Sequence, residues 1–270
     1  MKQYRIGDYA KYLGVTPDLL KHYEDMGIIH PTRSESGYRF YSFSTTNELI
    51  ESIRLRNYGL TLREIREVLT EHSVDNERMG RLFEENLERL RQEIRLDEAL
   101  AEDYAAFCLW REPLERRDWD WEIRWSRPMC FLPHTEHYDF LQDPRIYELL
   151  NIWMSFIPIV KSTMRADPDG GCTWGFVAEE SAVKRLQLPV NEVVERIPSR
   201  RIFYYKFRAP LLKMSEESAE NPAHPAFQLL RSFGLRHKGA YYRTLRGPAD
   251  WQKSLGYQYG FYAIPLKEEE

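Results

Sequence analysis

The sequence has little cysteine and no long apolar run. Its three cysteines are odd in number and widely separated, so they predict neither a disulfide framework nor a Cys-x-x-Cys motif. No stretch approaches the roughly 20 apolar residues that a membrane-spanning helix requires. No apolar signal segment follows the first few residues. We therefore expect a cytoplasmic protein that has no membrane segment, no metal site and no cofactor.

The overall charge of the chain is slightly negative, which by itself argues against a nucleic-acid-binding protein. The 270 residues carry 38 lysines and arginines against 42 aspartates and glutamates, which gives a net charge of −4. The acidic excess lies in residues 73–117, whereas residues 1–72 and 118–270 are each balanced. A DNA-binding function would therefore require positive side chains that are concentrated on one face. The 43% of hydrophobic residues is typical of a globular chain, and the length allows two domains.

Residues 1–72 contain the signals of several short helices. Apolar spacing predicts a first helix that ends at Gly14, and Thr16-Pro17-Asp18 is a typical beginning for a second helix. A β-prone segment follows at 38–41, and two further helices come after it, the later one capped by Thr61. Two helices joined by a tight turn can place the second helix in the major groove of DNA. This spacing alone is shared by many small helical domains.

A long helix is predicted for residues 76–112, which contain no proline. Its apolar residues recur at alternating spacings of four and three, with Asp97 as the single polar layer. A long helix packed on its own domain is the alternative. The stripe is narrow, however, and therefore fits a partner helix better than a wide core face. We expect a dimer seam formed by Phe83, Leu87, Leu90, Ile94, Ala101, Tyr104 and Cys108.

Residues 118–270 have a different pattern, rich in aromatic side chains. The strict alternation of Trp119–Trp125 predicts a half-buried strand. The pattern strand-helix-strand-strand occurs twice, which predicts an α+β sandwich. After the first strand, the expected elements are a helix at 144–163, strands at 173–178, around 182–188 and at 200–208, a helix at 225–234, and strands at 239–246 and 257–266.

Residues 4–70 resemble the MerR family of transcriptional regulators. The resemblance implies a winged helix-turn-helix over residues 1–72 and an antiparallel coiled-coil dimerisation helix over residues 73–117. The matching segments are Tyr4-Arg5-Ile6-Gly7-Asp8-Tyr9-Ala10, Gly14-Val15-Thr16-Pro17-Asp18, Leu20-Lys21-His22-Tyr23-Glu24, Gly27-Ile28-Ile29, Pro31-Thr32-Arg33, Gly37-Tyr38-Arg39-Phe40-Tyr41 and Tyr58-Gly59-Leu60-Thr61-Leu62-Arg63-Glu64-Ile65.

The resemblance also implies a mechanism. Such homodimers bind double-stranded promoter DNA and, when a small-molecule effector binds, bend and untwist it so that the elements recognised by RNA polymerase realign. The family usually has Arg-Tyr-Tyr where this chain has Lys21-His22-Tyr23, and lysine lacks the bidentate fork of arginine. The operator sequence and the sign of regulation therefore stay open. The implied DNA contacts are Thr16, Lys21, His22 and Tyr23 on the recognition helix, and Arg33, Tyr38, Arg39 and Tyr41 on the wing.

Residues 118–270 resemble a GyrI-like effector-binding domain, through Lys238-Gly239-Ala240-Tyr241-Tyr242-Arg243 and the ending Tyr259-Gly260-Phe261-Tyr262-Ala263-Ile264-Pro265-Leu266. In multidrug-sensing members a glutamate of the last strand meets a cationic ligand, and Phe261 stands at that position here. A phenyl ring can stack but cannot neutralise a cation, which favours a bulky aromatic or lipophilic ligand. Any single tryptophan could instead belong to the core. The candidate ligand residues are Trp153, Trp174, Tyr204, Tyr241 and Phe261.

Two other classes of function are weaker. A metal- or redox-responsive regulator would need several spaced ligands, but only Cys108 lies near the end of the long helix, and the pair His134 and His137 lies in a proline-flanked loop. A GyrI-like small-molecule hydrolase fused to a DNA-binding domain is the second alternative. The sequence contains no nucleophile elbow and no acid in the last strand, so we expect no catalytic residues.

Overall fold

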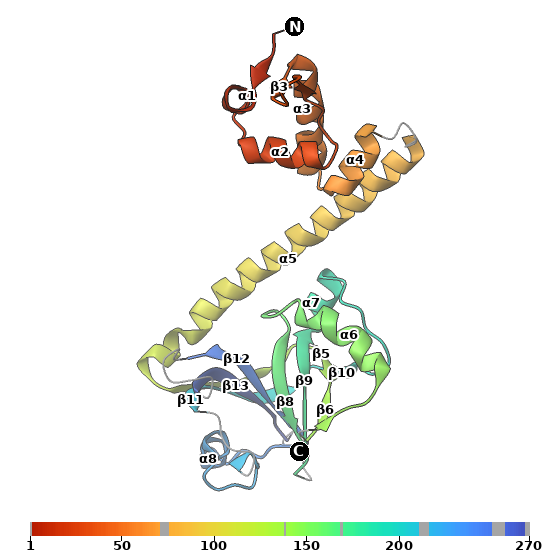
Figure 1. Cartoon of the computed structure of the whole chain (residues 1–270). Coiled ribbons are helices and arrows are strands. Elements are labelled where there is room, and N and C mark those ends of the chain that lie inside the picture. Colours follow the sequence, from red (N-terminus) through yellow and green to blue (C-terminus); the bar gives the residue numbers. More distant parts are fainter. Residues whose placement is uncertain are drawn as a thin grey trace. The chain divides into compact units, whose positions relative to one another are not determined.

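The chain folds into two compact units, Met1–Ile94 and Arg95–Glu270. The boundary lies inside the long helix α5 (Asn76–Arg116), whose beginning belongs to the first unit and whose end belongs to the second (Figure 1). The pattern of the sequence instead predicted a separate segment, residues 73–117, for this helix. In the described part of the chain, no helix combines the length and apolarity needed to cross a bilayer. The computed structural model describes residues 2–70, 76–137, 139–167, 170–210, 216–249 and 257–267.

The first unit begins with the predicted helix-turn-helix. In the turn, Gly14 has a φ of +67°, a left-handed conformation that glycine adopts without strain. Thr16 caps the second helix, because its Oγ1 accepts the backbone N–H of Leu19 at 3.1 Å, and Pro17 takes the first helical position. The two helices are α1 (Ile6–Leu13) and α2 (Pro17–Asp25). A small antiparallel sheet with the strand order β1-β3-β2 consists of β1 (Tyr4–Arg5), β2 (Thr32–Arg33) and β3 (Arg39–Tyr41).

Two further helices, α3 (Phe43–Asn57) and α4 (Leu62–Thr70), complete the first unit before α5. The predicted cap at Thr61 is confirmed, since its backbone N–H donates to Oε2 of Glu64 at 2.7 Å and its Oγ1 accepts the N–H of Glu64 at 3.3 Å. One core joins these elements. Its buried side chains are Tyr9, Ala10, Leu20, Tyr23, Ile28, Ile29, Tyr41, Leu49, Leu55, Leu60 and Ile65.

The second unit is built on one antiparallel sheet with the strand order β10-β5-β9-β8-β12-β13-β11-β4. A small ladder of β6 (Thr135–Glu136) and β7 (Asp139–Phe140) lies outside it. The strands of the large sheet are β4 (Trp119–Trp125), β5 (Met129–Pro133), β8 (Lys161–Ala166), β9 (Cys172–Glu179), β10 (Glu195–Ile197), β11 (Arg201–Pro210), β12 (Tyr241–Pro248) and β13 (Tyr257–Pro265).

The predicted doubling of the strand-helix-strand-strand pattern is present, but the first half uses other strands than expected, because β4 pairs with β11 of the second half. The first half is β5-α6-β8-β9 and the second is β11-α8-β12-β13, and the halves join where β8 pairs with β12. One glycine holds the same place in each half. A Cβ at Gly175 of β9 would clash with the ring of Phe131 on β5, and a Cβ at Gly260 of β13 would clash with the ring of Phe207 on β11. The same contact between a glycine and a phenylalanine ring therefore occurs in both halves, although the two halves show no repeat in their amino-acid sequence.

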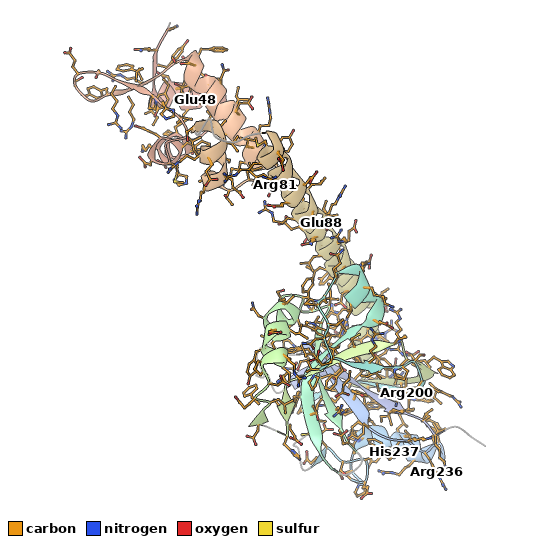
Figure 2. All side chains as sticks on the ribbon, turned by 90° about the vertical axis from the view of Figure 1, so that its right-hand side faces the viewer. Glu48, Arg81, Glu88, Arg200, Arg236 and His237 are labelled. Carbon is orange, nitrogen blue, oxygen red and sulfur yellow. The ribbon has the colours of Figure 1, made fainter. Side chains whose placement is uncertain are left out.

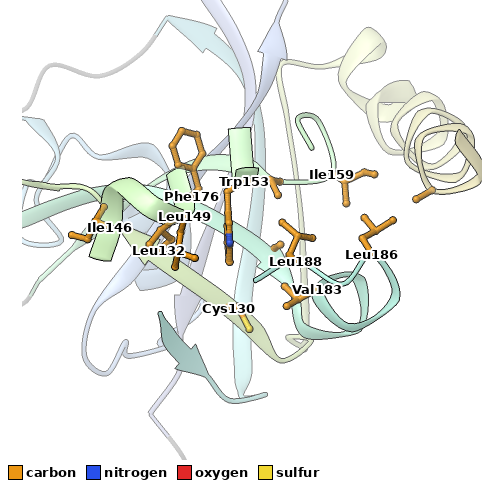
Figure 3. Close-up of a cluster of buried hydrophobic side chains, with 13 residues drawn as sticks. Cys130, Leu132, Ile146, Leu149, Trp153, Ile159, Phe176, Val183, Leu186 and Leu188 are labelled. Carbon is orange, nitrogen blue, oxygen red and sulfur yellow. The ribbon is translucent and has the colours of Figure 1, made fainter. Parts of the chain in front are cut away.

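Helices α6 (Pro144–Met154) and α8 (Pro225–Ser232) each cover a core against the sheet. Figure 3 shows the first core, in which Trp153 is fully buried and its indole N–H donates to the carbonyl oxygen of Pro189 at 2.9 Å. The second core lies between α8 and strands β11, β12 and β13 and includes Phe203, Phe227 and Tyr262. The predicted α+β class is therefore confirmed.

Three predicted details of the second unit are corrected. The helix expected at 144–163 ends at Met154 and β8 begins at Lys161, because Pro158 has no N–H to continue a helix. The segment expected to be a strand around 182–188 is largely helix α7 (Glu180–Arg185), supported by an ion pair of 2.9 Å between Lys184 and Glu180. Strands β5, β6, β7, β8 and β10 had not been predicted.

Candidate DNA-binding surface and ligand cavity

The exposed face of α2 presents polar side chains in the first unit. Lys21 and His22 are exposed, and Lys21 Nζ lies 3.1 Å from Oδ1 of Asp18. Thr16 is also exposed, although its hydroxyl oxygen is occupied as the helix cap. Side chains of this kind on a second helix can hydrogen-bond base edges and phosphates.

The wing is tied to α2 by one carboxylate. Glu24, largely buried, accepts from Arg33 Nη2 on Oε1 at 2.6 Å and from Arg39 Nε on Oε2 at 2.5 Å. One negative charge therefore holds two guanidinium groups, which leaves a local excess of positive charge at the junction of wing and helix. Tyr38 is exposed between them in sequence, and the guanidinium of Arg5 lies 5.3 Å from the centre of its ring. A domain without net positive charge would need such a local concentration of positive charge to approach DNA.

A cavity of about 550 Å³ lies in the second unit. One wall is α5, from Ala99 to Trp110, and the opposite wall is formed by strands of the large sheet. Five aromatic side chains line the cavity. Three of them, Trp110, Tyr204 and Phe261, lie together, with the ring centres of Tyr204 and Phe261 4.7 Å apart, and the other two are Trp125 and Tyr242. The Trp110 indole N–H donates to the Tyr204 hydroxyl at 2.9 Å, and burial raises the pKa of Tyr204 to about 12, so that this phenol is neutral near pH 7.

Charged side chains line the rest of the cavity. Asp103 of α5 lies 3.1 Å from Lys161 Nζ and 3.2 Å from Arg246 Nη1, and all three side chains are less than a fifth exposed. Arg124 stacks on the opposite side of the aromatic wall, with its guanidinium carbon 3.7 Å from the ring centre of Tyr204. Burial and the charge of Arg246 lower the pKa of Lys161. A cavity with an aromatic wall and a few buried charges is a typical small-molecule site.

Comparison with known proteins settles the family. Residues 4–72 match the model of the MerR HTH family regulatory proteins. Over 97 residues the chain is 35% identical to the HTH-type transcriptional regulator ZntR of Escherichia coli (strain K12), a match that covers 34% of this chain and 68% of ZntR. The chain belongs to the MerR family.

Other relatives differ in how much of the chain they share. The transcriptional regulator BrlR of Pseudomonas aeruginosa is 24% identical over 269 residues, which cover 91% of this chain and 94% of BrlR. The chain spans only 52% of the length of the mercuric resistance operon regulatory protein of Bacillus cereus, to which it is 40% identical over 68 residues. Among solved structures, an EcmrR–DNA complex covers 98% of this chain and is itself covered completely, with a TM-score of 0.41 and 14% identity.

Within this MerR-family chain, two expected DNA contacts are corrected. Tyr23 is 1% exposed and Tyr41 is 0% exposed, so neither ring can contact DNA without leaving the core. Tyr41 stacks on Tyr9 with ring centres 4.8 Å apart, and the hydroxyl of Tyr23 accepts from Arg56 at 3.5 Å. Both tyrosines therefore support the helix and the wing from inside. The remaining six expected contacts lie at least partly exposed at the surface, namely Thr16, Lys21, His22, Arg33, Tyr38 and Arg39.

The five expected ligand residues separate into two groups. Tyr204 and Phe261 line the cavity. Trp153 belongs to the core beneath α6, and Tyr241 and Trp174 belong to the core beneath α8 or pack against it. None of these three is among the residues that line the cavity. These three side chains pack in or against the two cores beneath α6 and α8, which agrees with the alternative that they belong to the core.

Sequence reasoning missed the cavity residues Trp110, Asp103, Lys161 and Arg246. Trp110 is the single tryptophan outside residues 118–270, and no role was predicted for it from the sequence. Asp103 and Trp110 share a face of α5 that is not the seam, and this second face was the available signal. Among the described residues, no three His, Cys, Asp or Glu side chains gather as metal ligands would.

Proposed function

We propose that this chain is a ligand-responsive transcriptional regulator that acts in the cytoplasm as a homodimer on double-stranded promoter DNA. The exposed residues of α2 and the positive junction at Glu24 support DNA contact. In this proposal Lys21 and His22 approach base edges, while Arg33 and Arg39 approach phosphates.

The exposed stripe of α5 supports the homodimer. Ile94 is 57% exposed and Tyr104 is 71% exposed, and Phe83 and Leu87 of the same predicted seam are also exposed in the single chain. Exposed apolar side chains in a continuous row along a helix are unfavourable in water, and a second helix that covers the row removes them from the solvent. A second copy of α5 is the partner that a heptad spacing fits best.

The proposal depends mainly on one observation, that helix α5 forms a wall of the cavity and also carries the residues of the predicted dimer seam. Asp103 and Trp110 of α5 line the cavity, whereas Ala101, Tyr104 and Cys108 lie on the predicted seam in the same turns. A ligand that contacts Trp110 or Asp103 therefore touches the dimer helix directly. Differential binding of the ligand to two positions of α5 would change the dimer and the distortion of the promoter that RNA polymerase meets.

The ligand that we propose is a bulky aromatic or lipophilic small molecule. The volume of about 550 Å³ suits such a ligand, and Trp110, Tyr204 and Phe261 offer rings on which it can stack. We propose no catalytic step, because ZntR and BrlR, which match this chain in sequence, are transcriptional regulators. A hydrolase would consume the molecule, whereas a sensor returns it unchanged.

Selection from a random DNA library tests the DNA-binding part. The dimer is expected to enrich an inverted repeat, and His22→Ala is expected to change the preferred bases. His30→Ala is a matched control, because His30 is also exposed but lies outside α2 and pairs with Glu48 at 3.5 Å. A single unrepeated half-site, or a preference changed equally by both variants, would contradict the proposal.

The ligand part is tested with 2-naphthamide as a neutral aromatic probe. Saturable quenching of tryptophan fluorescence, a changed affinity for the selected operator, and full recovery of the probe by mass spectrometry are expected together. Conversion of the probe to naphthoate would instead support the hydrolase alternative.

A further inference from the structure

The side chains that line the cavity are unbalanced in charge. Three carboxylates line it, from Glu102, Asp103 and Glu179, against six cationic side chains. The cations are Arg124, Arg127, Lys161, Arg185, Arg200 and Arg246.

Each carboxylate is already paired with a cation of the same cavity. Glu102 lies 2.7 Å from Arg185, and Glu179 lies 2.7 Å from Arg127. A ligand cation would therefore have to displace an arginine to reach either acid. Phe261 of β13 lines the cavity with a phenyl ring, so the aromatic wall adds no negative charge.

The excess of positive charge is found among the most buried charged side chains of the cavity. Asp103, 17% exposed, is the single carboxylate shared by Lys161 and Arg246, whose side chains are 18% and 11% exposed. Two largely buried cations that share one anion leave a net positive charge on side chains that have lost most of their contact with solvent, which is costly unless another anion compensates it. The Nζ of Lys161 has three donors, of which Asp103 and the carbonyl oxygen of Ile159 each take one. One donor stays available to a ligand.

A third cation has no acidic partner in the part of the chain that the structure describes. Arg200, which is labelled in Figure 2, forms no ion pair with any residue in the described ranges. Its backbone is fixed at the entry to β11, where its N–H donates to Ser126 Oγ at 3.0 Å and its carbonyl accepts the N–H of Ser126 at 2.8 Å. Arg124 is paired with Glu122 at 3.1 Å, but Glu122 does not line the cavity.

We infer that the cavity takes an organic anion, namely an aromatic ring system that carries a carboxylate, sulfonate or phosphate group. The ring stacks against Trp110, Tyr204 and Phe261, and the acidic group accepts from Lys161 and Arg246. Arg200 adds a further guanidinium at the lining. This inference rests on the proposed ligand-sensing function and specifies the charge of the effector.

Three probes of one shape test the charge. 2-Naphthoate, 2-naphthamide and 2-naphthylmethylammonium have the same ring system with negative, neutral and positive groups, and the full-length dimer is titrated with each by tryptophan fluorescence. We expect naphthoate to bind at least about tenfold more tightly than the ammonium compound, because charge-assisted hydrogen bonds are stronger than neutral ones. Its affinity is expected to fall as salt is added.

Substitutions test which cationic side chains of the cavity bind the acidic group of the ligand. Lys161→Met is expected to weaken naphthoate binding about tenfold and to change naphthamide binding less than about twofold. It leaves Asp103 paired with Arg246, so no buried carboxylate loses its only partner. Lys206→Met is the matched control, because Lys206 is similarly buried and pairs with Asp120 at 3.3 Å but does not line the cavity. Arg200→Gln repeats the test at a position whose loss leaves no acid unpaired.

The outcomes separate the two proposals. Tightest binding of the anion, lost in Lys161→Met or Arg200→Gln but kept in Lys206→Met, supports the inference. Equal or tighter binding of the neutral or cationic probe overturns the anion assignment and leaves the ligand-binding cavity standing. Absence of saturable binding for all three probes overturns the cavity as a ligand site and with it the proposed sensing function.

Discussion

The Nε of Arg39 lies 2.5 Å from Oε2 of Glu24, so the wing is bonded to the recognition helix by a side chain that is itself largely buried. Arg33 shares the same carboxylate at 2.6 Å. The two arginines are therefore held in place without DNA, so less side-chain entropy would be lost in the contact with phosphates that we propose. The same pair explains how a domain without net positive charge can still present a cationic edge.

Arg39→Ala is expected to weaken binding to every DNA sequence by a similar factor. A phosphate contact carries no base information, and its loss lowers the slope of log affinity against log salt by about one unit. Glu24 keeps Arg33 as a partner, so the variant leaves no buried acid alone. Arg81→Ala is the control, because Arg81 is an exposed arginine paired with Glu77 on α5. An unchanged slope, measured by fluorescence anisotropy from low to high salt, would remove Arg39 from the phosphate contacts.

Tyr41→Phe tests the corrected role of a wing residue. The Tyr41 hydroxyl is buried and has no hydrogen-bond partner among the described residues, and an unsatisfied buried hydroxyl costs about 1 kcal/mol or more. The phenylalanine keeps the ring stack with Tyr9. We therefore expect equal DNA affinity and an unfolding midpoint that is equal or higher, measured by anisotropy and differential scanning calorimetry. A large loss of DNA affinity would restore Tyr41 as a DNA contact.

The sequence predicted the first unit more closely than the second, for physical reasons. Gly14, Thr16 and Thr61 determine helix ends through contacts with residues three or four positions away, and such local contacts can be inferred from spacing. The cavity instead joins Asp103, Lys161 and Arg246, which are brought together only by the packing of α5 on the sheet. No local pattern records that contact. Trp153 and Phe261 have similar aromatic side chains, and only the fold decides that the first is core and the second lines the cavity.

The buried cluster around Glu217 predicts a dependence of stability on pH. Glu217 accepts from Arg243 and, at 3.0 Å, from the hydroxyl of Tyr262, and Nε2 of His224 lies 3.6 Å from its other oxygen. Burial alone would raise the pKa of Glu217, but His224 and Arg243 outweigh it, so the pKa is lowered. The folded state then favours the carboxylate. Its stabilisation is present above the unfolded pKa of about 4.3 and is lost as pH falls through the lower folded value.

Thermal unfolding between pH 3 and 7 checks this dependence. Glu217→Gln is expected to lower the midpoint at pH 7, since Arg243 is left buried without its anion, and to flatten the decline on the acid side. Glu220→Gln, at an exposed acid three residues away, is expected to follow the wild-type curve at every pH. If the unfolding midpoint of Glu217→Gln falls as steeply with decreasing pH as that of the wild type, the loss of stability in acid is due to other carboxylates.

Ile94→Asp is expected to separate the dimer. Ile94 is 57% exposed in the single chain, so the substitution has little effect on the packing of its own unit and acts on whatever covers the stripe. An aspartate buried at a helix–helix seam costs ~3 kcal/mol, which corresponds to a dissociation constant roughly 100-fold higher. Sedimentation equilibrium measures that constant directly. Gln92→Asp places the same charge two residues away, on the face of α5 opposite the predicted seam, and is expected to sediment like the wild type. If Ile94→Asp also sediments as the wild-type dimer, the seam does not run through Ile94, and the link that we propose between the cavity wall and the dimer helix loses its physical basis.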